Sequence, residues 1–83
     1  MATMEEVRRA KEAHEKELMA KKGVTGCAVG YKIRAGKRTN ELCIVCYVSE
    51  KKPLSELRKG DLIPREIEGV PTDVVESGEV RAL

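Results

Sequence analysis

The sequence predicts an α+β domain in which one N-terminal helix packs on a small sheet of about three strands. Residues 4–21 contain neither glycine nor proline, whereas residues 24–33 and 41–48 are apolar runs separated by a glycine-containing turn. Charged residues make up 36% of the chain, and phenylalanine and tryptophan are absent, so the core must be aliphatic and thin. We therefore expect residues 1–83 to form a single two-layered domain.

The helix is predicted to begin at a capping box formed by Thr3 and Glu6, because each residue can bond the other's backbone amide through its side chain. Gly23 follows two lysines, which is typical of a helix C-terminus, so the helix should end near Lys21. A narrow stripe should face the sheet, formed by Met4, Val7, Ala10, His14 and Leu18. Three acid–base pairs have the favourable spacing of four residues: Glu5 with Arg9, Glu12 with Lys16, and Glu17 with Lys21.

Residues 24–33 and 41–48 are predicted to pair as an antiparallel hairpin. The register that best matches size and charge gives these opposing pairs: Gly26 and Tyr47, Cys27 and Cys46, Val29 and Ile44, Tyr31 and Leu42, Lys32 and Glu41, Arg34 and Thr39. In this register the Tyr47 ring should cover Gly26. A helical turn is predicted at 54–57, a mostly irregular segment at 61–71, and a third strand at 72–76. The strand at 24–33 is expected to be central.

Both faces of the predicted sheet are apolar, but a single helix can cover only one of them. The face under the helix should carry Val29, Tyr31, Leu42, Ile44 and Val48. The reverse face has only the proline-containing C-terminal segment to cover it, and its glycines keep it flat. We therefore expect a contact surface between copies of the chain, formed by Gly26, Ala28, Gly30, Val45 and Tyr47. The alternative is that residues 54–83 cover this face within one molecule.

No residue pattern indicates catalysis, a metal or a cofactor, so we expect a non-enzymatic protein. Cys43 and Cys46 have the spacing of redox and zinc motifs, but residues three apart in a strand point to opposite faces. We expect these cysteines to be small buried apolar side chains. A disulfide between Cys27 and Cys46 is geometrically possible but disfavoured in a reducing cytosol. His14 is the single histidine and could complete no zinc site with the cysteines.

Four basic residues gather near the predicted hairpin turn: Lys32, Arg34, Lys37 and Arg38. They could contact nucleic-acid phosphates, but Tyr31 is the one nearby ring for base stacking, so ordinary solvated charges are favoured. Residues 1–60 carry 14 basic and 8 acidic residues, whereas residues 61–83 carry 2 and 6, an asymmetry that could steer partners. The charged N-terminus and the lack of a long apolar stretch lead us to expect a cytoplasmic protein without membrane contact.

Three segments carry a family resemblance: residues 23–32 (GVTGCAVGYK), 41–48 (ELCIVCYV) and 63–76 (IPREIEGVPTDVVE). Together with the charged N-terminal helix, the chain resembles the N-terminal domain that precedes the peptidase domain in bacterial trypsin-like serine peptidase-like proteins, related to the plant Nal1 type. The resemblance spans residues 5–82 and is most specific in 63–76. In that family the second strand typically reads AIVVYV, so Cys43 and Cys46 stand where aliphatic residues suffice.

The resemblance implies an accessory role, because residues 1–83 contain no Ser, His and Asp arrangement that could act as a triad. No catalytic residue is carried over. Two roles remain open: a self-assembly or protein-interaction module, and a propeptide-like chaperone or docking domain for a trypsin-like protease domain.

Overall fold

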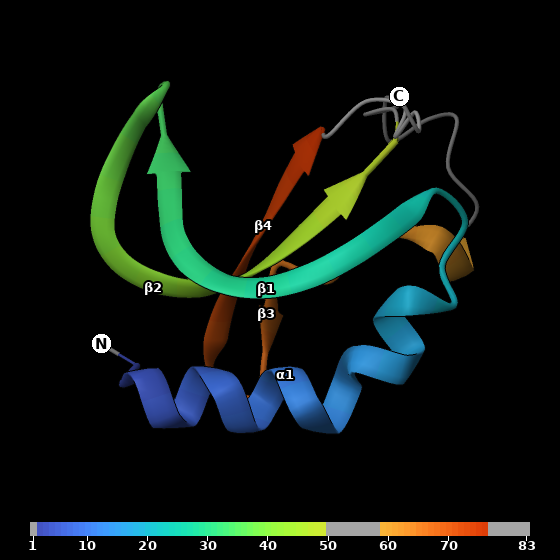
Figure 1. Ribbon diagram of the computed structural model, residues 1–83, viewed down its shortest axis with the longest axis horizontal. Coiled ribbons are helices and arrows are strands. Elements are labelled where there is room, and N and C mark those ends of the chain that lie inside the picture. Colours follow the sequence, from blue (N-terminus) through green and yellow to red (C-terminus); the bar gives the residue numbers. More distant parts are fainter. Residues whose placement is uncertain (1, 50–58, 77–83) are drawn as a thin grey trace, which may run out of the picture.

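The computed structural model describes residues 2–49 and 59–76, which form one helix and a four-stranded sheet (Figure 1). The elements follow the order α1 (Met4–Met19), β1 (Val24–Arg34), β2 (Lys37–Val48), the short 3₁₀ helix η2 (Lys59–Asp61), β3 (Glu66–Ile67) and β4 (Val70–Glu76). The predicted α+β class is confirmed, with four strands instead of about three. The helical turn predicted at 54–57 lies outside the described residues.

Helix α1 begins at the predicted capping box. The Thr3 hydroxyl accepts a hydrogen bond from the Glu6 amide at 3.2 Å, and the Glu6 carboxylate accepts one from the Thr3 amide at 3.3 Å. The helix ends two residues earlier than predicted, at Met19, and Gly23 adopts the expected left-handed conformation with φ +87°. The predicted stripe is buried at Val7, Ala10 and Leu18. Met4 is 54% exposed, whereas Ala2 packs against the core.

The sheet has the order β1-β2-β4-β3, so the prediction that residues 24–33 form the central strand is wrong. Strand β2 lies between β1, which is antiparallel to it, and β4, which is parallel to it. The physical reason lies in the apolar content of β2, since four consecutive residues from Cys43 to Cys46 are buried, as expected of a strand paired on both sides. Strand β1 therefore stands at one edge of the sheet.

The predicted register is confirmed along the body of the hairpin. Four of the predicted pairs are formed: Gly26 and Tyr47, Cys27 and Cys46, Val29 and Ile44, Tyr31 and Leu42. The predicted pairing around the turn is wrong, because Arg34 lies opposite Lys37. At the register shift between Tyr31 and Ile33, three residues of β2 (39–41) stand opposite one residue of β1, and this shortens the turn to Ala35 and Gly36.

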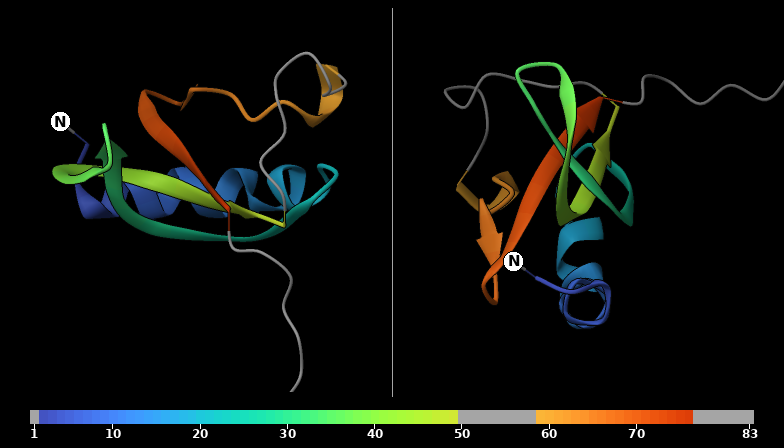
Figure 2. Two further views of the ribbon diagram at one scale, coloured as in Figure 1. Left: turned by 90° about the horizontal axis from the view of Figure 1, so that it is seen from above. Right: turned by 90° about the vertical axis from the view of Figure 1, so that its left-hand side faces the viewer.

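The β1–β2 hairpin is strongly curved, and its turn end curls away from α1 toward β4 (Figures 1 and 2). Two hydrogen bonds join the curled end to β4: the Lys32 ammonium donates to the Thr72 carbonyl at 2.7 Å, and the Ile33 amide donates to the Asp73 carboxylate at 3.0 Å. Lys32 therefore does not lie opposite Glu41 as predicted. Arg34 takes that carboxylate instead, at 2.9 Å.

The main core lies between α1 and the sheet. Its buried members are Val7, Ala10, Leu18, Ile44, Cys46, Ile67 and Val70. Half-buried apolar side chains pack against them: Cys27, Val29, Leu42 and Ile63. The predicted face under the helix is therefore correct for the middle of the hairpin. Tyr31 was expected there as well, but it is 38% exposed because the hairpin curls away from α1 at that point.

Candidate functional site

The five residues predicted to form a contact surface divide into an inner and an outer group. Val45 is 6% exposed, and Gly30 lies against its side chain. Gly26 and Ala28 on β1 are half-buried, and Tyr47 on β2 is 36% exposed. Val45 thus has little surface to offer to a partner. We call the accessible set, Gly26, Ala28 and Tyr47, the edge patch.

The Tyr47 ring does not cover Gly26 as predicted, although the two residues are opposite in the register. A Cβ atom built on Gly26 would meet nothing within 4 Å, so the space above this glycine is open. Val75 of β4 lies opposite Tyr47 on the other side of β2 and is half-buried. The edge patch is therefore the accessible end of the sheet face that points away from α1.

The edge patch borders the outer edge of β1. This strand is 11 residues long, and among residues 2–49 and 59–76 no strand pairs with its outer side. Register shifts near Val24 and near Lys32 delimit a regular stretch, residues 26–31, that contains no charged residue and no proline. Charges, prolines and bulges are the usual protections of an edge strand, so this stretch is protected only at its ends.

The basic residues of the hairpin end are largely used within the fold. Lys32 holds β4, and Arg34 pairs with Glu41. The Arg38 guanidinium lies over the Tyr31 ring, 4.4 Å from its centroid, in a cation–π contact. Lys37 is exposed. The structure therefore brings the four predicted residues to one end of the molecule but gives three of them intramolecular partners.

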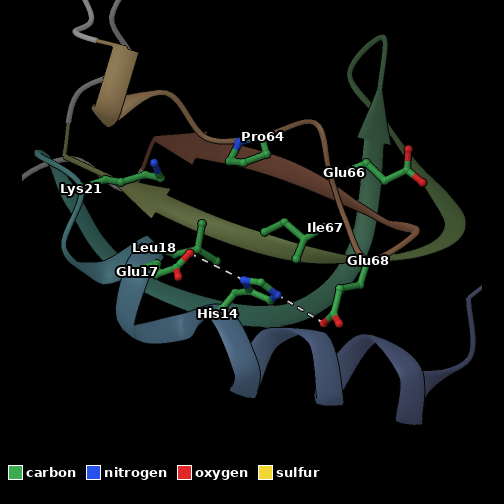
Figure 3. A pocket seen from close by; sticks show the side chains of 8 residues that line it. All are labelled: His14, Glu17, Leu18, Lys21, Pro64, Glu66, Ile67 and Glu68. Atoms are coloured by element: carbon green, nitrogen blue, oxygen red, sulfur yellow. Dashed lines mark ion pairs between the residues drawn. The ribbon is translucent and has the colours of Figure 1, made fainter.

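A second feature, which the sequence did not indicate, is a groove of about 330 Å³ between α1 and the β3–β4 turn (Figure 3). The lining residues are His14, Glu17, Leu18, Lys21, Pro64, Glu66, Ile67 and Glu68. The His14 ring stands between two carboxylates, with Nε2 3.3 Å from Glu68 and Nδ1 3.7 Å from Glu17. Glu68 lies 54 positions from His14 along the chain, so no local sequence pattern signals this contact.

Two hydrogen bonds near the groove connect the residues that follow α1 to η2. The Lys21 ammonium donates to the Gly60 carbonyl at 2.8 Å, and the Lys22 amide donates to the Asp61 carboxylate at 3.0 Å. Lys21 was expected to pair with Glu17, which contacts His14 instead. Lys21 and Glu68 therefore each take part in a contact between the N-terminal and the C-terminal half of the chain.

The three cysteines have free thiols and lie on both faces of the β1–β2 hairpin. Cys27 and Cys46 point toward α1, and their sulfurs are 4.0 Å apart. Cys43 belongs to the opposite face, where it is fully buried opposite Gly30. Burial raises the pKa of Cys43 to about 11 and that of Cys46 to about 12, and it also raises the pKa of Cys27. Such thiols carry little thiolate at neutral pH and therefore react slowly there; their reactivity rises with pH.

Within the described ranges, no group of three or more His, Cys, Asp or Glu side chains is placed to hold a metal ion. None of the helices in the same ranges is long and apolar enough to cross a membrane.

Comparison with known proteins gives one family match. The family described as the NARROW LEAF 1 N-terminal domain matches residues 1–78, which include the helix and all four strands. The match supports the relation to the Nal1 type that the sequence motifs indicated. A comparison with curated proteins gives no significant match.

Proposed function

The chain belongs to the NARROW LEAF 1 N-terminal domain family, and we propose that it acts as a non-enzymatic self-association module. One observation carries this proposal: the outer edge of β1 has no neighbouring strand among the described residues, and residues 26–31 carry neither charge nor proline. Edge strands of this kind are ready templates for pairing with another chain. We propose that a second copy pairs there.

The contact would combine backbone pairing with the side chains of the edge patch. An antiparallel pair of β1 strands, related by a two-fold axis, would extend the sheet across both molecules. Because Gly26 leaves open space beside the exposed Tyr47, the partner's backbone or side chain can approach closely. The Tyr47 ring then supplies apolar area with a hydroxyl at the rim, which is a common composition of interfaces.

In this arrangement the basic residues at the hairpin end stabilise the fold, because three of the four already have partners within the molecule. An interface of backbone hydrogen bonds and apolar side chains should depend weakly on ionic strength. Binding through the basic hairpin end to a nucleic acid would weaken steeply with added salt. The salt dependence of association therefore separates the two mechanisms.

A second candidate partner is a trypsin-like protease domain, for which this chain would be a propeptide-like chaperone or docking domain. The family description names an N-terminal domain, which supports a further domain in proteins of this family. The same edge patch would then meet another part of a longer protein. A cytoplasmic location is also part of the proposal.

Native mass spectrometry and sedimentation equilibrium on the purified chain test self-association. We expect a dimer or a larger species at micromolar concentration, and a population that rises with concentration and changes little with added salt. A strict monomer at about 100 μM, well above the dissociation constants of typical specific interfaces, would contradict the proposal.

A further inference from the structure

Cys27 and Cys46 face each other across the β1–β2 ladder, since they are opposing residues in the register and their sulfurs are 4.0 Å apart. The Cα atoms of opposing residues in an antiparallel pair lie about 4.5–5.5 Å apart, within the range of about 4.4–6.8 Å found across disulfides. A bond would require the two sulfurs to approach each other by about 2 Å, a movement that side-chain rotation and a small strand adjustment can supply.

The two thiols differ in accessibility. Cys46 is fully buried in the core beneath α1, whereas Cys27 is half-buried on the edge strand. An oxidant that approaches from solvent therefore meets Cys27 first. Burial raises the pKa of both thiols, but their mutual contact lowers the pKa of Cys27 and raises that of Cys46, so it favours ionisation of Cys27. Cys43 points to the other face and has no part in this pair.

We propose that Cys27 and Cys46 form a modification site, at which a small organic disulfide such as oxidised glutathione generates an intramolecular disulfide bond. The proposal is independent of the proposed self-association, because both sulfurs belong to one molecule. Two successive thiol–disulfide exchanges are required, and both are balanced by the oxidant.

In the first exchange the Cys27 thiol loses its proton and its sulfur attacks the oxidant. A mixed disulfide forms, and the first glutathione leaves as a thiolate that takes up this proton. In the second exchange the Cys46 thiol loses its proton and attacks the Cys27 sulfur, which releases the second glutathione. The two cysteine sulfurs are oxidised by two electrons in total, and the oxidant is reduced to two thiols.

The bond would fix the edge strand to the centre of the sheet. Strand β1 has one neighbouring strand in the described structure, so its separation from β2 is an expected route of local opening. A bond between Cys27 and Cys46 would link the two strands directly and close a loop that contains the turn of the hairpin. Closing this loop restricts the unfolded chain and should stabilise the oxidised protein.

The test uses the complete purified chain, incubated with oxidised glutathione at mildly alkaline pH and analysed by intact mass and peptide mapping. We expect the monomer to lose two hydrogens, the peptides containing Cys27 and Cys46 to be linked, and the urea midpoint to rise until a reductant is added. The Cys43→Val variant should behave in the same way. The Cys46→Val variant should stop at a glutathione adduct on Cys27.

Three results would overturn the proposal: no loss of hydrogens under conditions that oxidise the unfolded chain, a linkage that includes Cys43, or linkage only between molecules. The Cys27→Val variant is the matched control for the first attack. It should remain free of both the internal bond and the adduct. Because the readout is the mass of the monomer, a failure here leaves the self-association experiment unaffected.

Discussion

Gly30 of β1 lies against the side chain of Val45 in β2, so that a Cβ atom at position 30 would stand 3.1 Å from Val45 Cγ2. This separation is tighter than ordinary van der Waals contact. The contact lies one residue before Tyr31, on the face of the sheet opposite to Ile44 and Cys46, which pack under α1. The absence of a side chain at Gly30 allows β1 to pass over a buried valine.

Replacing Gly30 with alanine should therefore destabilise the protein by about 1 kcal/mol, because overpacking outweighs the entropic gain of removing a strand glycine. Urea denaturation at neutral pH measures the change. Gly26→Ala is the matched control, since its new Cβ meets nothing within 4 Å. It should be neutral or stabilise by up to about 1 kcal/mol. Equal changes in stability for Gly30→Ala and Gly26→Ala would contradict a close contact between position 30 and Val45.

These two glycines also show what the sequence could and could not predict. Strand alternation places Gly26 and Gly30 on one face, and the sequence assigned both to a flat contact surface. The structure leaves Gly26 open and places Gly30 against the side chain of the buried Val45. Curvature depends on register shifts and on contacts with β4, and residue alternation does not encode either of them.

Local features were more predictable than distant ones. The capping box at Thr3 and the opposition of Cys27 and Cys46 follow from residues close in sequence or from matching two adjacent strands. The central position of β2 depends on where β4 pairs after a long connection. The contact of His14 with Glu68 depends on the same connection, so neither could be read from local patterns.

The two tight turns of the sheet predict a stabilising substitution. Ala35 has φ 51° and Gly36 has φ 76°, so both central residues of the β1–β2 turn are left-handed, as a type I′ turn requires. Alanine is strained there, whereas asparagine tolerates this conformation. Ala35→Asn should therefore stabilise the protein by about 0.5–1 kcal/mol, measured by urea denaturation.

The β3–β4 turn provides the comparison, because Glu68 has the same φ of 51° and Gly69 follows it with φ 79°. Glu68→Asn gains the same conformational advantage but loses the carboxylate that lies 3.3 Å from His14 Nε2. It should therefore stabilise less than Ala35→Asn. An equal or larger gain would show that the contact with His14 contributes nothing to stability.

The buried cysteines predict a loss of stability at alkaline pH. Burial raises the pKa of Cys43 to about 11 and of Cys46 to about 12 from an ordinary value of 9.0, so the folded protein holds these protons more tightly than the unfolded chain. Their contribution is fully present below pH 9 and is lost as pH rises toward 11 and 12.

The double variant Cys43→Val and Cys46→Val should lack this alkaline loss, while its stability at neutral pH should change by less than about 1.5 kcal/mol. The urea midpoints of the wild type and the double variant are measured from neutral pH upward. Subtracting one pH profile from the other removes the effects of groups that both proteins share. Parallel pH profiles would show that these thiols do not contribute. Stoichiometric zinc in the purified protein, or unfolding by a chelator, would contradict a purely structural role.

Tyr47 offers the sharpest test of the edge patch, because its side chain is exposed in the single molecule. Tyr47→Asp should fold normally by circular dichroism but lose association, since an unpaired carboxylate buried in an interface is strongly disfavoured. Tyr47→Lys should also lose association, because it would bury an unpaired ammonium group. Tyr47→Phe keeps the aromatic ring and should still associate. Native mass spectrometry reports each result, with Met19→Asp on the exposed side of α1 as a charge control.

Mixing the Asp and Lys variants of Tyr47 then tests the symmetry of the contact. If the two copies meet around a two-fold axis near the edge patch, the opposite charges should pair across it, and a mixed dimer should form where neither variant associates alone. If the Tyr47→Asp variant associates as strongly as the wild type, the interface lies elsewhere on the molecule. Unfolding of this variant would show that Tyr47 belongs to the interior, where this face is covered within one chain.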